Sequence, residues 1–279
     1  MTTSRRSFLC NASLATGLLL LQKPFKSLGA ITDNTTYLSG NNRECMIWYT
    51  NDMHGQVSCL LPAQREGLLL DAGDFTDHAH SLDMSLNMIH AMNKAGYHAA
   101  TIGNRELANG QAALASLLPH MQFVLVNCNY RFTDPVLRRG VLPYKIVYAG
   151  SIKIGITGVG PQLASNTGVA CLPPVAAANA IAASLKKDHG CQVVICLSHL
   201  GDQQLPGNKQ MATDSTHIDF VIGGHQQQLQ KMMIYRNQLN NEVYFSQAGW
   251  DGMMVGHMKM LFNEDRQGCG IRPGHIMKA

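Results

Sequence analysis

Five short segments of this chain carry side chains of the types that bind metal ions in proteins, and each segment follows an apolar run. In chain order they are Asn51-Asp52-Met53-His54-Gly55, Asp71-Ala72-Gly73-Asp74, Gly103-Asn104-Arg105-Glu106, Ser198-His199-Leu200-Gly201 and Gly223-Gly224-His225-Gln226-Gln227. Carboxylate oxygens, amide oxygens and imidazole nitrogens together suit divalent ions such as Zn²⁺ or Mn²⁺. Any single segment would pass for an ordinary turn, because Asp and Asn beside Gly favour turns. Five in succession predict a shared metal site.

The apolar runs predict the elements that position these segments. Strands are expected at 45–49, 68–70, 99–102, 123–126, 192–197, 220–222, 243–245 and 253–260, with a hairpin at 144–149 and 152–157. Helices are expected at 82–92, 111–118 and 174–187. Strands that alternate with helices predict an α/β fold, in which ligands bind at the carboxyl ends of the strands. No repeat or linker interrupts the pattern, so we expect a single domain.

The five segments resemble the motifs of the calcineurin-like metallophosphoesterases, specifically the catalytic domain of the 5′-nucleotidase/UDP-sugar hydrolase family. They read Asp-x-His, Gly-Asp, Gly-Asn-x-Glu, Ser-His and Gly-His-x-Gln, in the order of that family. The resemblance extends to Ala95-Gly96-Tyr97 and Gln247-Ala248-Gly249-Trp250, and it covers residues 44–262. It implies a four-layer α-β-β-α sandwich and hydrolysis of phosphate esters or nucleotides.

The resemblance also implies a site for two divalent ions, drawn from Zn, Mn, Fe, Co or Mg. Asp52, His54 and Gln227 would hold one ion. Asn104, His199 and His225 would hold the other, with Asp74 bridging the two. Gln227 stands where many phosphoesterases have a second His, and members of the nucleotidase branch have Gln or Asn there. Two such ions can clamp the attacking and leaving oxygens of an in-line phosphoryl displacement.

One catalytic element of the family is missing. The family motif Gly-Asn-His-Glu-Phe-Asp uses its His on the phosphate or leaving group and its Asp to orient that His, but here Arg105 and Ala108 replace them. Arg105 remains charged and cannot donate a proton, although it can stabilise a phosphoryl group. General acid–base help is typically worth about 10²–10⁴-fold, so we expect a weakened phosphatase. His78 or His80 would be a substitute, with exposed loop histidines as the plainer interpretation.

A second departure is the length of the chain. In two-domain nucleotidases a carboxy-terminal domain binds the nucleoside, whereas here only nineteen residues follow Met260 and we expect 263–279 to be an irregular tail. A separate nucleotide-binding chain would then supply that half of the site. The alternative function is a metal-binding pseudoenzyme, or a non-catalytic subunit that pairs with such a chain.

The amino-terminal residues 1–30 predict an export signal. Ser4-Arg5-Arg6-Ser7-Phe8-Leu9 resembles the twin-arginine signal, with Cys10 where Lys is common, and an apolar run of about ten residues follows. An ordinary signal with two arginines is the alternative. A spanning helix needs about 20 residues, so no stable membrane span is expected. We therefore expect a periplasmic protein, membrane-tethered only if the signal is retained.

The net charge of +4 belongs to that signal. Four of the 22 basic residues lie within 1–30, so the remaining 18 equal the 18 acidic residues. The neutral body argues against a nucleic-acid polymer as partner. The cysteines form no Cys-x-x-Cys pair, which argues against a zinc ribbon, and several lie in apolar runs as buried thiols do.

Overall fold

The computed structural model describes residues 35–38, 44–56, 66–77, 81–262 and 269–278. These residues belong to one unit, Thr32–Ala279. The predicted export signal at 1–30 and the two histidines considered as substitutes, His78 and His80, lie outside the described residues.

One sheet, here called the β2 sheet, carries the first three of the segments predicted to bind metal. Its strand order among the described residues is β16-β15-β2-β3-β4-β5-β7. The bounds are β2 Glu44–Thr50, β3 Leu68–Asp71, β4 Ala99–Ala100, β5 Val124–Val126, β7 Val141–Leu142, β15 Met254–Phe262 and β16 Cys269–Lys278. Neighbouring strands run parallel from β2 through β3, β4 and β5 to β7, and Thr50 pairs with Asp71 while Asp71 pairs with Ala100. The three segments therefore leave the sheet at the same level.

The other large sheet, here called the β9 sheet, carries the last two segments. Its strand order in the described chain is β1-β8-β9-β11-β12-β14-β13. The bounds are β1 Thr35–Leu38, β8 Tyr144–Ala149, β9 Ile152–Val159, β11 Val193–Ser198, β12 Phe220–Gly223, β13 Gln230–Arg236 and β14 Glu242–Gln247. Ser198 pairs with Gly223 in parallel register, so the segments after β11 and β12 also begin at one level.

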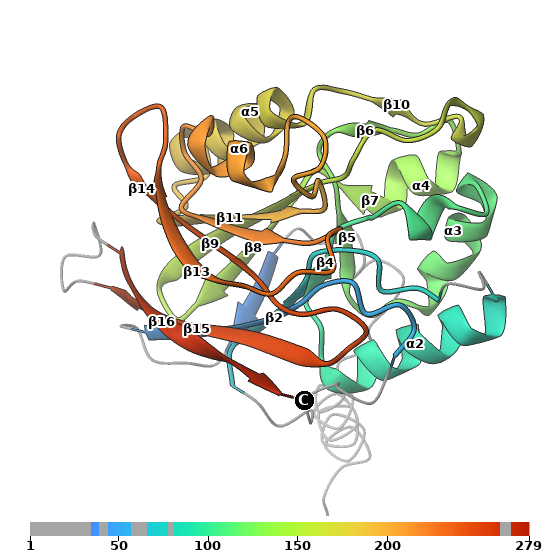
Figure 1. Ribbon diagram of the computed structural model, residues 1–279, viewed down its shortest axis with the longest axis horizontal. Coiled ribbons are helices and arrows are strands. Elements are labelled where there is room, and N and C mark those ends of the chain that lie inside the picture. Colours follow the sequence, from blue (N-terminus) through green and yellow to red (C-terminus); the bar gives the residue numbers. More distant parts are fainter. Residues whose placement is uncertain (1–34, 39–43, 57–65, 78–80, 263–268, 279) are drawn as a thin grey trace, which may run out of the picture. The chain divides into compact units, whose positions relative to one another are not determined.

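Helices cover the outer face of each sheet (Figure 1). The helices are α2 Leu82–Ala95, α3 Gln111–Leu117, α4 Pro135–Gly140, α5 Pro174–Lys187 and α6 Asn208–Thr213, with short 3₁₀ turns η2 Arg105–Leu107, η3 Leu118–His120 and η4 Ser165–Thr167. The small strands β6 Tyr130–Arg131 and β10 Ala170–Cys171 pair with each other. Gly96 ends α2 in the left-handed conformation with φ 82°, which glycine adopts without a steric cost.

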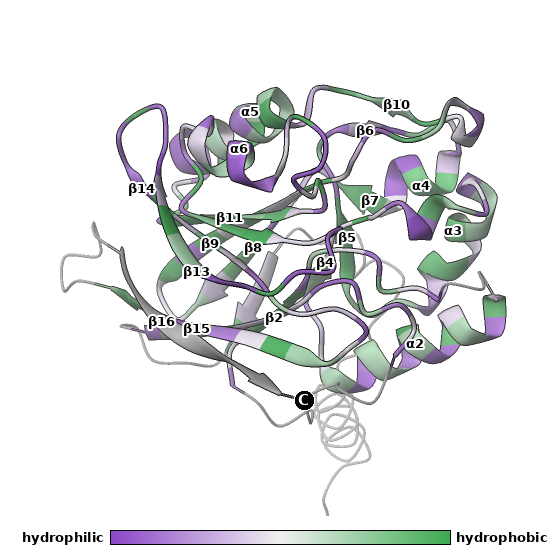
Figure 2. Ribbon diagram, in the orientation of Figure 1, coloured by the Kyte–Doolittle hydropathy of each residue, from purple (hydrophilic) through white to green (hydrophobic). Residues whose placement is uncertain are grey.

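Three apolar cores separate the layers. The first joins inward residues of both sheets, such as Tyr49 and Phe220, whose rings meet edge to face with centroids 5.9 Å apart. The second packs α2 and α3 on the β2 sheet, and the third packs α5 and α6 on the β9 sheet. Apolar residues accordingly concentrate on central strands such as β11 (Figure 2). Helix, sheet, sheet and helix form the expected four-layer sandwich in a single domain.

The structure corrects the predicted limits of this domain. Strand β1 lies before residue 44 and pairs with β8, so the sandwich begins earlier than expected. The prediction of an irregular tail over 263–279 is wrong for 269–278, because β16 pairs with β15 in antiparallel register. Strand β16 contains Pro273 and ends the strand order of the sheet, and an edge strand tolerates proline because one side needs no hydrogen-bond donor.

Candidate metal centre

The carboxyl ends of the two sheets bring five predicted ligands into one cluster. Ligand atoms of Asp52, His54 and Asp74 lie within 4.8 Å of one another, and so do those of Asp74, His199 and His225. Asp74 belongs to both groups, which is the position expected of a residue that bridges two ions. All of these side chains except His225 are buried. The β2 sheet supplies three of them and the β9 sheet two.

The backbone of the cluster is held in a conformation that most residues avoid. Asp52, His54, Asp74 and His225 have positive φ angles of 50°, 50°, 56° and 78°. Each such residue costs about 1–3 kcal/mol, and such strain gathers at functional sites. Hydrogen bonds between neighbouring loops offset the strain: the Asp52 amide donates to the Gly73 carbonyl at 2.9 Å and the His54 amide to the Asp74 carbonyl at 3.0 Å. These hydrogen bonds hold the loops in a conformation that directs the side chains toward one another.

Two histidines are oriented by hydrogen bonds behind the cluster. Nδ1 of His199 lies 2.7 Å from the Ala72 carbonyl oxygen, and Nδ1 of His54 lies 2.6 Å from Oδ1 of Asp251. A proton on each Nδ1 leaves the Nε2 lone pair directed at the cluster, the arrangement typical of metal-bound histidine. Nε2 of His199 is buried, lies 3.2 Å from Oδ2 of Asp74, and has no hydrogen-bond partner among the described residues. The residues present therefore fit a metal ion.

The electrostatics of the cluster also favour a cation. Burial raises the pKa of Asp52 to about 6. Burial opposes ionisation of Asp74 as well, but the nearby His199 and Arg105 charges hold the pKa of Asp74 below its usual range. Burial lowers the pKa of His199, whereas the Asp74 and Asp52 carboxylates outweigh burial and raise it to about 10. Without a metal, a proton on His199 balances the negative charge of the two carboxylates. A bound cation would balance that charge in place of the proton.

The other two predicted ligands have exposed side chains. Asn104 precedes Arg105, whose backbone amide donates to Oδ1 of Asp74 at 2.9 Å, so the Asn104 loop borders the cluster. Gln227 follows His225 by two residues in an exposed loop. The assignment of these two residues as ligands stays a prediction.

Arg105 lies in the site as the sequence placed it. Its Nε is 3.3 Å from Oδ2 of Asp74, and its side chain is 17% exposed. Ala108 ends the 3₁₀ turn that Arg105 begins, and the Ala108 amide donates to the Arg105 carbonyl at 3.1 Å. The positive charge of the Arg105 guanidinium therefore lies next to the carboxylate of Asp74, which both candidate ligand groups share.

Sequence reasoning missed two supporting carboxylates. Glu106 is buried, and its oxygens accept hydrogen bonds from the amides of Asp74, Thr76 and Gly103. It belongs to the Gly-Asn-x-Glu motif, so the signal was visible although no role was assigned. Asp251 follows Trp250 directly and orients His54 across the fold.

Similarity to known proteins agrees with this geometry, although no family model matches the chain. Over 172 residues the chain is 31% identical to the snake venom 5′-nucleotidase of Gloydius brevicauda, a match that covers 57% of this chain and 28% of that protein. It is 31% identical to the 5′-nucleotidase of Rattus norvegicus over 175 residues, covering 57% and 29%. The match thus spans about a third of the length of these curated relatives.

Solved structures share the fold. A 5′-nucleotidase precursor from Thermus thermophilus superposes with a TM-score of 0.74 at 21% identity, over 84% of this chain and 54% of that one. A calcineurin-like phosphoesterase from Bacillus subtilis gives a TM-score of 0.67 at 20% identity, over 85% and 91%. The chain therefore has the calcineurin-like phosphoesterase fold and is related in sequence to 5′-nucleotidases. In the part of the chain that is described, no helix has the length and apolar character needed to cross a membrane.

Proposed function

Because the chain has this fold and this relationship, we propose that it is an exported two-metal hydrolase of phosphate esters or nucleotides. The observation that carries the proposal is the cluster in which Asp74 belongs to two ligand groups at once. Asp52, His54 and Gln227 would hold one ion and Asn104, His199 and His225 the other. When bound, two neighbouring divalent ions polarise a phosphoryl oxygen and help to activate water for in-line displacement.

The protein's own residues would bind and orient the ester. The Arg105 guanidinium offers parallel charged donors, which match two oxygens of a phosphoryl group. It cannot protonate a leaving group, because it keeps its proton at any working pH. We therefore expect turnover that is reduced by about 10²–10⁴-fold relative to a site with a general acid.

The direct test is hydrolysis of p-nitrophenyl phosphate by purified protein loaded with Mn²⁺, Zn²⁺ or Co²⁺, together with metal analysis of the same sample. Two bound ions with turnover support the proposal. The absence of turnover with all three metals would contradict it.

A second candidate function is a metal-binding pseudoenzyme, and the contact between Arg105 and Asp74 is the observation that favours it. The combined change Arg105→His with Ala108→Asp separates the two candidates. Side chains three residues apart eclipse in a 3₁₀ turn, so the new carboxylate would lie beside the new imidazole. A large gain in turnover would indicate a competent hydrolase site. No gain, with two ions bound, would indicate a pseudoenzyme.

Export and a separate partner chain belong to this proposal as well. The Thermus thermophilus neighbour is described as a precursor, which agrees with export. Fractionation of cells that produce the full chain should place it in the periplasm, and Arg5→Lys with Arg6→Lys should retain it in the cytoplasm if the twin-arginine route is used. Co-purification of a nucleotide-binding chain from the native envelope would support catalysis within a complex.

A further inference from the structure

Asn208, the first residue of α6, is fully buried and joins two loops of the β9 sheet. Its Oδ1 atom accepts hydrogen bonds from the Ser198 hydroxyl at 2.7 Å and from the Leu200 amide at 3.3 Å. Its Nδ2 atom donates to the Gly224 carbonyl at 3.0 Å. One side chain thus links the segment after β11 to the segment after β12.

Each of these hydrogen bonds ends next to a predicted metal ligand. Ser198 and Leu200 flank His199 in the sequence. Gly224 directly precedes His225. The two imidazole rings lie with their centroids 5.1 Å apart and their planes at 75° to each other. The bonds of Asn208 therefore connect the backbone positions from which these two rings extend.

The backbone after β12 packs tightly against both His199 and Asn208. An added Cβ on Gly224 would lie 2.8 Å from Nδ1 of His199, and one on Gly223 would lie 3.1 Å from Nδ2 of Asn208. Both distances are shorter than ordinary van der Waals contact. A shift of this backbone would therefore disturb the ring of His199 as well as that of His225.

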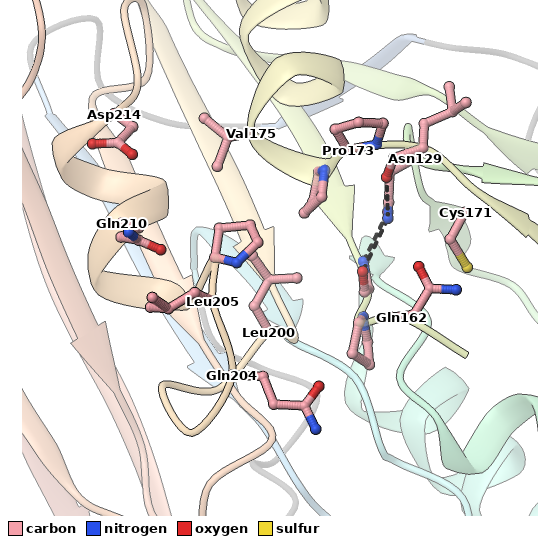
Figure 3. A pocket seen from close by; sticks show the side chains of 15 residues that line it. Asn129, Gln162, Cys171, Pro173, Val175, Leu200, Gln204, Leu205, Gln210 and Asp214 are labelled. Carbon is pink, nitrogen blue, oxygen red and sulfur yellow. Dashed lines mark hydrogen bonds between the residues drawn. The ribbon is translucent and has the colours of Figure 1, made fainter. Parts of the chain in front are cut away.

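The segment between β11 and α6 borders a cavity of about 770 Å³ (Figure 3). Leu200 and Leu205 of this segment line the cavity, together with Gln210 of α6. Leu205 is 80% exposed, so its side chain has little protein to pack against. Hydrogen bonds hold the segment to α6 instead, and they include a bond of 2.6 Å from the Asn208 amide to the Gly201 carbonyl.

An amide side chain suits this position because the position needs both an acceptor and a donor. Asn offers a carbonyl oxygen to the Ser198 and Leu200 donors and an NH₂ group to the Gly224 carbonyl. Buried polar groups are normally paired, and here one residue pairs groups from both loops. Removal of the Asn208 side chain would therefore free the two loops to move relative to each other.

We propose that Asn208 is a positioning residue that holds His199 and His225 in place to bind the same divalent ion. It acts through the residues next to the two histidines. This inference rests on the proposed function, which assigns both histidines to one of two ions. The effect of Asn208 should therefore be strongest for that ion.

Binding of Mn²⁺ to an Asn208→Ala variant tests the inference. Calorimetry of the purified, metal-free full chain should show two bound ions in the unaltered protein. In Asn208→Ala one ion should bind about tenfold more weakly, the cost typical of losing a residue that orients a ligand. The affinity of the other ion, which is assigned to Asp52 and His54, should change much less. Equal weakening of both ions, or of neither, would overturn the inference.

Asn237→Ala is the matched control. Asn237 is also a buried amide, and it accepts from the Leu239 and Asn241 amides, both at 3.0 Å, and donates to the Thr216 carbonyl at 3.2 Å. It lies in the hairpin between β13 and β14, at the amino end of β14, whereas the predicted ligands follow the carboxyl ends of strands. Asn237→Ala should bind both ions as the unaltered protein does. The same loss of affinity in both variants would count against positioning by Asn208.

Ser198→Ala keeps the test decisive if Asn208→Ala does not fold. It removes only the hydroxyl that donates to Oδ1 of Asn208. Its control is Ser215→Ala, which removes an equally buried hydroxyl that donates to the Ala212 carbonyl at 2.9 Å. Ser198→Ala should weaken the same ion by about two- to fivefold, the effect of one hydrogen bond. Equal Mn²⁺ affinities in the two serine variants would overturn the inference.

A measurement on metal-free protein separates failure of this inference from failure of the proposed function. The rings of His199 and His225 are close enough to give a nuclear Overhauser effect between their ring protons in protein with isotope-labelled histidine. Asn208→Ala should weaken this effect and Asn237→Ala should preserve it. If the unaltered protein binds no Mn²⁺, the proposed function fails, and the Overhauser effect alone decides whether Asn208 positions the rings. If two ions bind with turnover and Asn208→Ala changes neither readout, the proposed function stands and this inference falls.

Discussion

Glu106 links the backbone of two loops that carry candidate ligands. One of its oxygens accepts from the amides of Asp74 and Gly103, and the other accepts from the amide and hydroxyl of Thr76. Glutamine at this position would turn an NH₂ group toward backbone donors. We expect Glu106→Gln to lower the free energy of unfolding of metal-free protein by about 2 kcal/mol, since buried donors lose their acceptor. Urea titration followed by tryptophan fluorescence measures the change.

The matched control is Glu242→Gln, which alters an exposed ion pair with Arg236 at 3.6 Å. Such a surface pair contributes about 0–1 kcal/mol. Equal unfolding curves for the two variants would show that Glu106 does not hold the loops in place.

Asp251 is expected to act on the metal through His54. Its carboxylate lies 2.6 Å from Nδ1 of His54, although its own side chain is 43% exposed. Losing a partner that orients a ligand typically costs about 10–100-fold in metal affinity. Asp251→Asn should therefore weaken Mn²⁺ binding in calorimetry, whereas Asp188→Asn at the exposed end of α5 should not. Unchanged affinity in Asp251→Asn would refute this role.

The residue scale also shows what sequence could reveal. Asp52 and Asp74 were predictable because each follows a short apolar run, and a parallel sheet collects such positions at one edge. Asp251 was not predictable, because it meets His54 across 197 residues of sequence and belongs to the connection between the two sheets. No local pattern marks such a contact, which arises only from the packing of the sandwich.

At the scale of elements, the pairing of β15 with β2 depends on a glycine. Gly256 pairs with Tyr49, and an added Cβ would collide with the Tyr49 ring, including Cδ2 at 2.8 Å. The ring cannot withdraw easily, since it is buried and its hydroxyl lies 2.7 Å from Oγ of Ser246. Overpacking of this kind costs about 1–3 kcal/mol, so Gly256→Ala should lower Tm measurably in circular dichroism.

Lys259→Ala in the same strand is the control for this change. It removes an exposed contact with Glu44 at 3.1 Å and should shift Tm little. A Gly256→Ala protein as stable as Lys259→Ala would mean that the strand yields to the added methyl group.

The strands that are most buried in the structure were the easiest to predict from the sequence. Strand β11 is buried at every position and was evident as an apolar run. Strand β13 was missed because it leaves Met233 and Ile234 exposed, so its apolar residues do not alternate cleanly. Helix α6 has six residues, too few for a helical period to be recognised.

At the scale of the whole molecule, the candidate metal centre joins the two sheets. Asp52, His54 and Asp74 come from the β2 sheet, whereas His199 and His225 come from the β9 sheet. An ion held by Asp74, His199 and His225 would therefore link both halves of the sandwich, and it would be bound only while the halves are docked. A ligand that binds the folded state alone stabilises it by about 2.7 kcal/mol at 100 times its Kd.

We therefore expect protein loaded with Mn²⁺ to need more urea for unfolding than the same protein treated with a chelator. Both sheets should unfold in one transition, because the core between them is shared. His225→Ala offers a sharp comparison, since it removes an exposed side chain that is predicted to bind the metal and leaves the buried core intact. In this variant Mn²⁺ should raise the urea midpoint of unfolding by less than it does in the unaltered protein. The urea midpoint of the metal-free variant should stay close to that of the metal-free unaltered protein. If saturating Mn²⁺ leaves the urea midpoint unchanged in both the unaltered protein and the His225→Ala variant, the ions do not bridge the sheets. The five clustered side chains would then have to be explained without a shared metal.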